Sequence, residues 1–386
     1  MKWIELEKLS DIELGKTPAR KETSYWHGNN VWLSIADLNK KYVYESKEEI
    51  TDKAISETNI KIVPKNTVVM SFKLSIGKRA ITKKALYTNE AIAAFHIKDT
   101  DSLFYEYLYY ALGYVDLLKY TDKAVKGKTL NKAKLRKIKI PVPPIEIQEQ
   151  IVEVLDKAQN LIDKRKEQIS FLDDLIESIF YEMFGDPVKN EKGWEILCLN
   201  NVCDVRDGTH DSPKYISDGY PLITSKNVKD GKLNFNDIKY ISEKDFNNIN
   251  KRSKVDMGDI LMPMIGTIGN PTIIDSNNKF AIKNVALIKF FESSKVINIY
   301  VKELLKSSYF EKAIRREKRG GTQKFISLGN IRNFEIPVPP LPLQNQFAEK
   351  VEAIEKQKAT LTESLELMED NYNSIMQRAF KGELFR

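Results

Sequence analysis

The chain is poor in the residue types that bind metals or form disulfides. Its 386 residues include two cysteines, Cys198 and Cys203, and three histidines. Two thiols without a second pair are too few for a disulfide framework or a four-ligand zinc site, and no two histidines have metal-ligand spacing. We therefore expect no metal centre, and we interpret the cysteines as packing residues of a protein in a reducing cytoplasm.

Long apolar runs and a strong charge of one sign are missing as well. No run approaches the roughly 18 apolar residues that span a bilayer, and residues 1–5 do not resemble a signal peptide. Lys and Arg number 61 against 54 Asp and Glu, so the net charge of +7 permits a polyanionic partner. A length of 386 residues, of which 42% are hydrophobic, predicts two or more packed domains, and the lack of a long apolar run predicts no membrane segment.

Signatures of enzymes that act on nucleic acids are not found either. Lys126-Gly127-Lys128-Thr129 imitates the end of a phosphate-binding loop, but Asp122 stands where that loop needs a glycine. Each Pro-Pro pair is flanked by apolar residues, which cannot hydrogen-bond a flipped adenine, and no glycine-rich turn suits a methyl-donor cofactor. No Pro-Asp dipeptide begins a nuclease motif. We therefore predict a binding protein without a cofactor rather than an enzyme.

What is present is a repeat that covers nearly the whole chain. The element Ile-Pro-Val-Pro-Pro-x-x-x-Gln-x-Gln occurs at 140–150 and again at 336–346. Trp3-x-x-Leu6 precedes the first copy as Trp194-x-x-Leu197 precedes the second. The markers keep their order with an offset that drifts slowly, as loop insertions would cause. Two diverged copies of one unit are therefore predicted.

A long helix is predicted after each Pro-Pro pair, because apolar residues recur there at steps of three and four. Each run covers roughly 40 residues, or about 60 Å of helix. A small domain cannot bury so long a stripe, so we expect the two helices to pack on each other as an antiparallel coiled coil. The stripe assigned to the first helix contains Ile147, Ile151, Val154, Leu155, Ala158, Leu161, Ile162, Ile169, Leu172, Leu175, Ile176, Ile179, Met183 and Phe184.

The remaining stretches contain short apolar runs, such as Thr67–Phe72 and Asp259–Met264, between Gly, Asn, Asp and Pro. These runs predict strands, and tyrosine-rich patches between them predict helices. The fold class is therefore α+β: two mixed α/β domains joined by two long antiparallel helices, with a pseudo-two-fold repeat. The predicted parts are a domain at 1–140, a helix at 141–187, a domain at 188–336 and a helix at 337–386.

Basic residues gather at the same place in both copies. Nine residues from Lys119 to Lys139 are Lys or Arg, and a second basic run from Lys312 to Lys324 surrounds two glycines. Lys and Arg neutralise phosphates, and glycine lets a backbone approach a duplex closely. The occurrence of a basic run in both copies favours DNA contact over a merely solvated loop.

Candidate DNA contacts are residues whose side chains donate to phosphates or to base edges. In the first copy we assign Lys16, Arg20, Lys78, Arg79, Lys126 and Lys128. In the second copy we assign Arg206, His210, Lys214, Lys226, Asn227, Arg319, Gln323 and Lys324.

Together these features resemble the specificity subunits of type I restriction-modification systems. The resemblance covers essentially all of the chain. It rests on the doubled Pro-Pro element, the long helix after each copy, the helix exit Phe184-Gly185-Asp186-Pro187, the stretch Asp207–Pro213 and the ending Phe380-Lys381-Gly382-Glu383-Leu384.

The resemblance implies a function for each part. Each mixed domain is a target recognition domain that reads one half of a split, asymmetric site in double-stranded DNA, and the helices set the spacing. Two methylation subunits bring catalysis and S-adenosylmethionine, and a restriction or translocase subunit joins in some systems. Gln148 and Gln344 fit a helix cap and a partner contact equally well. The assigned partner-binding residues are Pro143, Pro144, Gln148, Pro339, Pro340 and Gln344. The rival interpretation is a coiled-coil scaffold whose basic loops bind RNA or an acidic protein.

Overall fold

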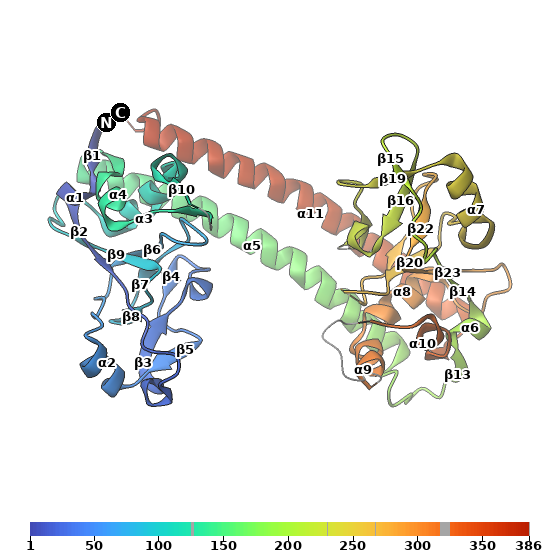
Figure 1. Ribbon diagram of the computed structural model, residues 1–386. Helices are drawn as coiled ribbons and strands as arrows, with labels where there is room; N and C mark the ends of the chain where they lie inside the picture. Colours follow the sequence, from blue (N-terminus) through green and yellow to red (C-terminus); the bar gives the residue numbers. More distant parts are fainter. Residues whose placement is uncertain (125–126, 230, 267, 317–324, 386) are drawn as a thin grey trace. The chain divides into compact units, whose positions relative to one another are not determined.

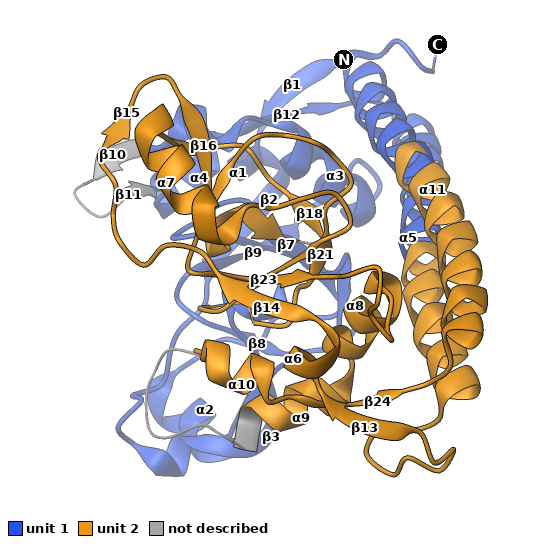
Figure 2. Cartoon of the chain, turned by 90° about the vertical axis from the view of Figure 1, so that its right-hand side faces the viewer, with its two compact units in different colours: residues 1–166, 364–386 blue, residues 167–363 orange. Residues whose placement is uncertain are grey.

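We describe the chain from a computed structural model, which covers residues 1–124, 127–229, 231–266, 268–316 and 325–385. The chain divides into two compact units, which Figure 2 colours separately. Unit 1 comprises Met1–Lys166 with Ser364–Arg386, and unit 2 comprises Glu167–Glu363. Each unit holds one mixed α/β domain and a part of two long helices, α5 (Ile145–Phe184) and α11 (Leu341–Lys381), which Figure 1 labels and Figure 2 divides by colour.

Unit 1 is built on two sheets. The larger has the order β2 (Ser10–Leu14), β9 (Ile92–Ile97), β6 (Val68–Ser71), β7 (Arg79–Thr82) and β4 (Tyr42–Val43). The smaller has the order β5 (Glu48–Ile50), β3 (Trp26–Leu33) and β8 (Tyr87–Thr88). Two further strands, β10 (Asp122–Ala124) and β11 (Gly127–Thr129), form a hairpin. The helices of this domain are α1 (Leu6–Leu9), α2 (Asp52–Thr58), α3 (Tyr105–Tyr114) and α4 (Lys132–Lys137).

Unit 2 repeats this plan with small changes at the sheet edges. One sheet has the order β14 (Asp204–Asp207), β23 (Val285–Lys289), β20 (Ile260–Pro263) and β21 (Thr272–Ile273). The other has the order β15 (Tyr215–Ile216), β19 (Lys239–Ile241), β16 (Tyr220–Thr224) and β22 (Ala281–Lys283). A hairpin pairs β17 (Val228–Lys229) with β18 (Lys232–Leu233). The helices are α6 (Leu199–Val202), α7 (Glu243–Ser253), α8 (Asn298–Lys306), α9 (Ser308–Arg316) and α10 (Leu328–Arg332).

The central sheet of each unit is covered on both faces. In β6, Val68 and Met70 join the cluster that includes α3 and α5, whereas Val69 joins the cluster formed with β3. In β20, Ile260 and Met262 face the helices while Leu261 packs toward β16 and β22. Side chains alternate between the faces of a strand, so a strand covered on both faces needs an unbroken apolar run. The two runs expected as strands are therefore confirmed as central strands.

Each Pro-Pro element forms a strand that pairs with the start of its own copy. β1 (Lys2–Glu5) is antiparallel to β12 (Lys139–Val142), and β13 (Glu195–Cys198) is antiparallel to β24 (Glu335–Val338). Pro141 lies opposite Trp3, but its counterpart Pro337 lies opposite Ile196. Trp3 and Trp194 are therefore not equivalent, and aligning the two tryptophans was wrong by two residues.

Within each unit the long helices pack on each other in opposite directions. In unit 1 the start of α5 shares a core with the end of α11, since Ile151 and Leu155 lie in one cluster with Phe380. In unit 2 the end of α5 meets the start of α11, where Phe184 contacts Phe347 at 5.2 Å between ring centroids. The expected fold, two mixed α/β domains in an internal repeat with two long antiparallel helices, is confirmed.

The buried stripe of α5 is narrower than the sequence suggested. Leu155, Ile162 and Ile176 are buried and are separated by multiples of seven residues, while Leu161 and Leu175 are 55% and 44% exposed. A coiled coil buries its a and d positions, and Leu161 and Leu175 lie outside that series. Assigning these two leucines to the buried stripe was wrong.

Candidate nucleic-acid interface

A glycine that lies against the backbone of another segment begins the predicted contact loop of each domain. An added Cβ at Gly15 would lie 2.2 Å from the Asn89 carbonyl oxygen, and one at Gly208 would lie 2.2 Å from the Ile282 carbonyl oxygen. Only glycine therefore fits where the chain leaves β2 or β14. The two glycines are equivalent, since each follows the first strand of the central sheet of its domain. Residues 16–20 follow the first glycine and residues 209–214 follow the second.

In unit 1 this loop exposes two of the predicted cations. The Lys16 ammonium donates to the Thr58 carbonyl oxygen. The Arg20 guanidinium forms a two-fold ion pair with Glu48 and lies 4.0 Å from the centroid of the Trp26 ring. Both cations are exposed, so they can reach a ligand.

A hollow of about 600 Å³ lies beside Arg20. Its lining includes Trp26, His27, Gly28 and Glu48. Trp26 and Asn30 both pair with Ile50, so the three residues between them bulge out of the ladder and expose His27. Bulges are frequent beside binding sites because they change the direction of a side chain.

Lys78 and Arg79 differ in their availability. Lys78 is exposed. Arg79 is half-buried, donates through Nε to the Tyr109 carbonyl oxygen at 2.7 Å, and lies 4.7 Å from the centroid of the Tyr109 ring. Arg79 thus ties β7 to α3, which favours a structural role over DNA contact.

In unit 2, His210 is oriented by a buried carboxylate. Its Nε2 lies 2.8 Å from Asp207 Oδ2, and its Nδ1 lies 2.8 Å from Asn284 Oδ1. The Asp207 side chain is 5% exposed and also pairs with Arg252, whereas that of His210 is 65% exposed. His210 therefore presents its ring to solvent in a fixed orientation.

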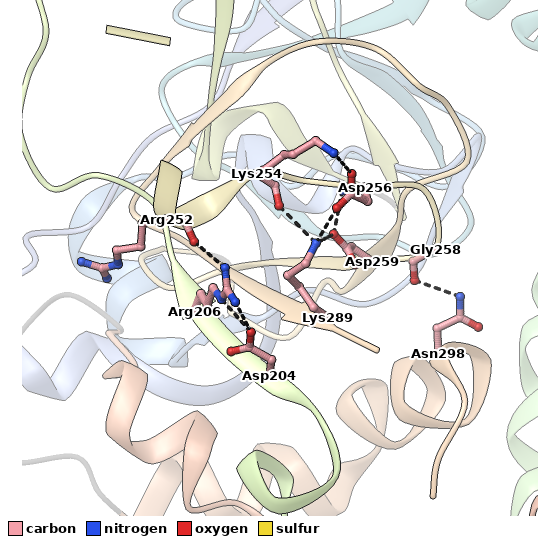
Figure 3. A network of polar contacts seen from close by, with 9 residues as sticks. All are labelled: Asp204, Arg206, Arg252, Lys254, Asp256, Gly258, Asp259, Lys289 and Asn298. Carbon is pink, nitrogen blue, oxygen red and sulfur yellow. Dashed lines mark hydrogen bonds and ion pairs between the residues drawn. The ribbon is translucent and has the colours of Figure 1, made fainter. Parts of the chain in front are cut away.

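Arg206 belongs to a network of charged groups around β14 and β23 (Figure 3). Its Nε donates to Asp204 at 2.7 Å and its Nη1 to the Arg252 carbonyl oxygen at 2.8 Å. Lys289 Nζ donates to Asp256 at 3.0 Å and to Asp259 at 2.6 Å (Figure 3).

The two carboxyls that pair with Lys289 differ in burial and in pKa. Burial raises the pKa of Asp259, whereas hydrogen bonds from Lys254 and Lys289 lower the pKa of Asp256. The network joins the loop before β20 to its sheet. Arg206 and Lys289 thus support the fold of the domain.

Asn227 is a turn residue. It is 7% exposed; its Oδ1 accepts from the Thr224 amide at 3.0 Å, and its Nδ2 donates to the Asn234 carbonyl oxygen at 3.0 Å. Ser34 and Asp37 form the same capping box in unit 1. Because the amide forms its bonds inside the domain, the structure favours a structural role of Asn227 over contact with a base edge. Lys214 and Lys226 are exposed.

Several predicted contacts lie outside the described residues. They are Lys126, Arg319, Gln323 and Lys324. Of Lys128 only the backbone is described, in β11.

Gln148 and Gln344 have identical roles at the starts of the long helices. Both are completely buried. The Gln148 amide accepts from the Phe104 amide and donates to the Ser102 and Pro143 carbonyl oxygens, each at 2.9 Å. Gln344 repeats this pattern with Ile297, Lys295 and Pro339. Complete burial and bonds within one unit favour the structural alternative over partner contact for both residues.

The prolines of the two turns divide into buried and exposed members. Pro143 and Pro339 are buried, whereas Pro144 and Pro340 are exposed. The exposed pair is therefore the part of the predicted partner surface that a second protein can reach.

Sequence reasoning missed the groups that orient the exposed donors. Asp207 precedes His210 by three residues and could have been suspected from that spacing. Glu48 and Arg252 act over long separations in the chain, for which a single sequence gives no signal.

The chain matches a known family over most of its length. The model of a family described as "Type I restriction modification DNA specificity domain" matches residues 1–170 and 191–367. The chain therefore belongs to the family of type I restriction-modification DNA specificity subunits. Members of this family supply recognition, so the chain is a non-catalytic recognition subunit.

Similar proteins cover nearly its full length. The type I restriction enzyme MjaIX specificity subunit of Methanocaldococcus jannaschii is 25% identical over 415 residues, which span 98% of this chain and 92% of the relative. The EcoBI specificity subunit of Escherichia coli is 23% identical over 331 residues, or 77% of this chain and 69% of the relative.

Solved structures share the fold. A type I restriction-modification S subunit from M. genitalium has a TM-score of 0.51 at 13% identity and covers 98% of this chain and 96% of its own. A chain from a study of assembly and conformational transition of the type I R-M system has a TM-score of 0.60 at 16% identity, with coverage of 99% and 98%. In the described part of the chain, no helix is both long and apolar enough to cross a membrane.

Proposed function

We propose that the two mixed domains read the two halves of a bipartite, asymmetric site in double-stranded DNA. The observation that supports this most is the pair of equivalent glycines, each of which begins a loop with exposed donors. The loop after Gly15 carries Arg20 and the loop after Gly208 carries His210, at different distances from the glycine. Two domains of the same fold that expose different hydrogen-bond donors are suited to two different half-sites.

The exposed donors are the proposed contacts. They are Lys16, Arg20 and Lys78 in unit 1, and His210, Lys214 and Lys226 in unit 2. To these we add the basic loops that the sequence predicts, with Lys126, Lys128, Arg319, Gln323 and Lys324. Lysine ammonium groups neutralise phosphates, which provides most of the affinity for DNA. Planar or forked donor groups, such as imidazole and guanidinium, select bases.

The partners follow from the repeat. Pro144 and Pro340 are exposed at equivalent turns, so one kind of protein can dock twice. We assign these places to two methylation subunits, which bring S-adenosylmethionine and transfer the methyl group. A restriction or translocase subunit joins where the system has one, and the complex works in the cytoplasm.

Mapping methylation tests this function. The full chain, expressed with its methylation subunits, should direct methylation of adenines within one split sequence. The chain alone, with S-adenosylmethionine, should transfer no methyl groups. Methyl transfer by the chain alone would contradict the proposal. Methylation without sequence preference, together with equal binding of RNA and DNA, would support the rival scaffold function instead.

A further inference from the structure

Arg20 is held in one orientation by three neighbouring side chains. Its terminal nitrogens both pair with Glu48, and the second ion-pair contact, from Nη2 to Oε2, is 3.0 Å long. Its guanidinium lies 4.0 Å from the centroid of the Trp26 ring and 4.9 Å from that of Trp32. A bidentate carboxylate fixes the plane of the guanidinium, and contact with an aromatic ring fixes the distance of the guanidinium from that ring.

The loop that carries Arg20 is fixed by the same two tryptophans. The Trp32 indole donates to the Lys16 carbonyl oxygen at 3.0 Å, and the Trp26 indole donates to the Ala19 carbonyl oxygen at 3.3 Å. The two rings meet edge to face, with centroids 5.1 Å apart. Backbone and side chain of Arg20 are thus both ordered before any ligand arrives. Such preorganisation lowers the entropy cost of binding.

Although it is oriented, Arg20 remains accessible. Its side chain is 53% exposed and borders the hollow of about 600 Å³. A guanidinium has five N–H donors, and the ion pair with Glu48 uses two of them.

The charge around Arg20 favours a neutral ligand atom over a phosphate. Glu48 compensates the guanidinium, and Glu49 and Lys47, which line the same hollow, offset each other, so that no excess of positive charge attracts a phosphate. A phosphate brought to this place would gain the attraction of Arg20 and suffer the repulsion of these carboxylates. The oxygen and nitrogen acceptors of a base carry no net charge, so they gain the hydrogen bonds without that repulsion.

This inference rests on the proposed function. We propose that Arg20 selects a guanine in the first half-site by donating to its O6 and N7 in the major groove, with Glu48 and Trp26 as positioning residues. Guanine is the base whose major-groove edge offers two acceptors to a forked donor. The exposed lysines of the domain, Lys16 in the same loop and Lys78, then contact the phosphates of the DNA backbone.

Substitution of Arg20 tests the assignment in the full chain assembled with its methylation subunits. In Arg20→Ala, discrimination at one G·C pair of the first half-site should fall roughly 5- to 150-fold, with the second half-site and the salt dependence of binding unchanged. Arg20→Lys should lose the same discrimination, since an ammonium keeps the charge but not the fork. Lys98→Gln is the matched control, because Lys98 also forms an exposed ion pair in unit 1, with Asp11.

The variant Glu48→Gln tests whether the charge of Glu48 is needed for Arg20 to select guanine. It removes the compensating charge while keeping the size of the side chain. The preference for guanine should weaken, and binding should become more dependent on salt by up to about one unit in the logarithmic slope, because the uncompensated Arg20 then attracts a phosphate.

Two outcomes would overturn the assignment. A uniform loss of affinity in Arg20→Ala, with a slope reduced by about one unit, would make Arg20 a phosphate contact. An unchanged recognition sequence in both folded Arg20 variants would make the ion pair purely structural. If the wild-type complex methylates no defined sequence, the proposed function itself has failed, and that result is distinct from both.

Discussion

At the scale of single residues, a glutamine side chain satisfies the backbone groups at the start of each long helix. In each copy two prolines connect the end of a strand to the start of a long helix, and carbonyl groups at this connection need hydrogen-bond donors. Gln148 supplies donors to two carbonyl oxygens and an acceptor to one amide, and Gln344 does the same in the second copy. Tyr107 and Tyr300 add matching bonds, each 2.7 Å long, to the carbonyl oxygens of the first proline in each element.

Removal of one of these amides should therefore be costly. Gln148→Ala leaves a buried amide and two carbonyl oxygens without partners, so the domain should lose roughly 2–4 kcal/mol of stability. Gln150→Ala, two residues further along the helix at an exposed position, should change it by less than about 0.5 kcal/mol. Thermal unfolding of both variants is the measurement. Equal unfolding temperatures for Gln148→Ala and Gln150→Ala would show that the buried hydrogen bonds of Gln148 contribute nothing to stability.

Residue roles were harder to predict than residue types. Lys16, Arg20 and His210, which are exposed, could be named from the donors of their side chains. Asn227 carries the same chemistry but is buried, and burial depends on the tertiary fold rather than on the identity of the residue. Gln148 stood in the repeated element, yet only the fold shows that its amide faces inward.

At the scale of elements, the long helices follow a heptad pattern. One series of buried and half-buried residues of α5 runs through 151, 155, 158, 162, 165, 169, 172, 176 and 179, in alternating steps of four and three. Polar members interrupt the apolar series. Arg165 occupies one such position in α5, and Lys358 of α11 is half-buried where it pairs with Asp173. Polar residues at such positions specify the register of a coiled coil.

Adjacent residues of α5 should respond very differently to truncation. Ile162 is 3% exposed and Leu161 is 55% exposed. Ile162→Ala should cost roughly 2–4 kcal/mol of stability, and Leu161→Ala should change it by less than about 1 kcal/mol. Chemical denaturation of the two variants compares them directly. A larger loss for Leu161→Ala would place the helix interface on the wrong face.

The helices were predictable because one period repeats over many turns. The small error concerned the width of the stripe, where Leu161 and Leu175 are apolar but lie outside the heptad series. Sheet order was not predictable, because pairs such as Ser10 with Ile97 join segments far apart in the sequence. The repeat in the sequence indicated only that the two domains have the same strand order, without indicating what that order is.

At the scale of the whole molecule, duplication links fold to function. Both domains share the order of their central strands, and both attach to their helices through a Pro-Pro strand paired with the first strand of the copy. Duplication keeps this frame while the exposed loops diverge. A chain built so can read two unlike half-sites, which a symmetric dimer of one domain cannot do.

Exchange of one recognition domain is the most direct test of this modular interpretation. Residues 194–338, which include the whole of β13 and β24, would be replaced by the corresponding domain of a related subunit. Methylation mapping of the assembled complex should then show a new second half-site, with the first half-site and the spacer length retained. A change in both half-sites, or in neither, would contradict the claim that each domain reads its own half.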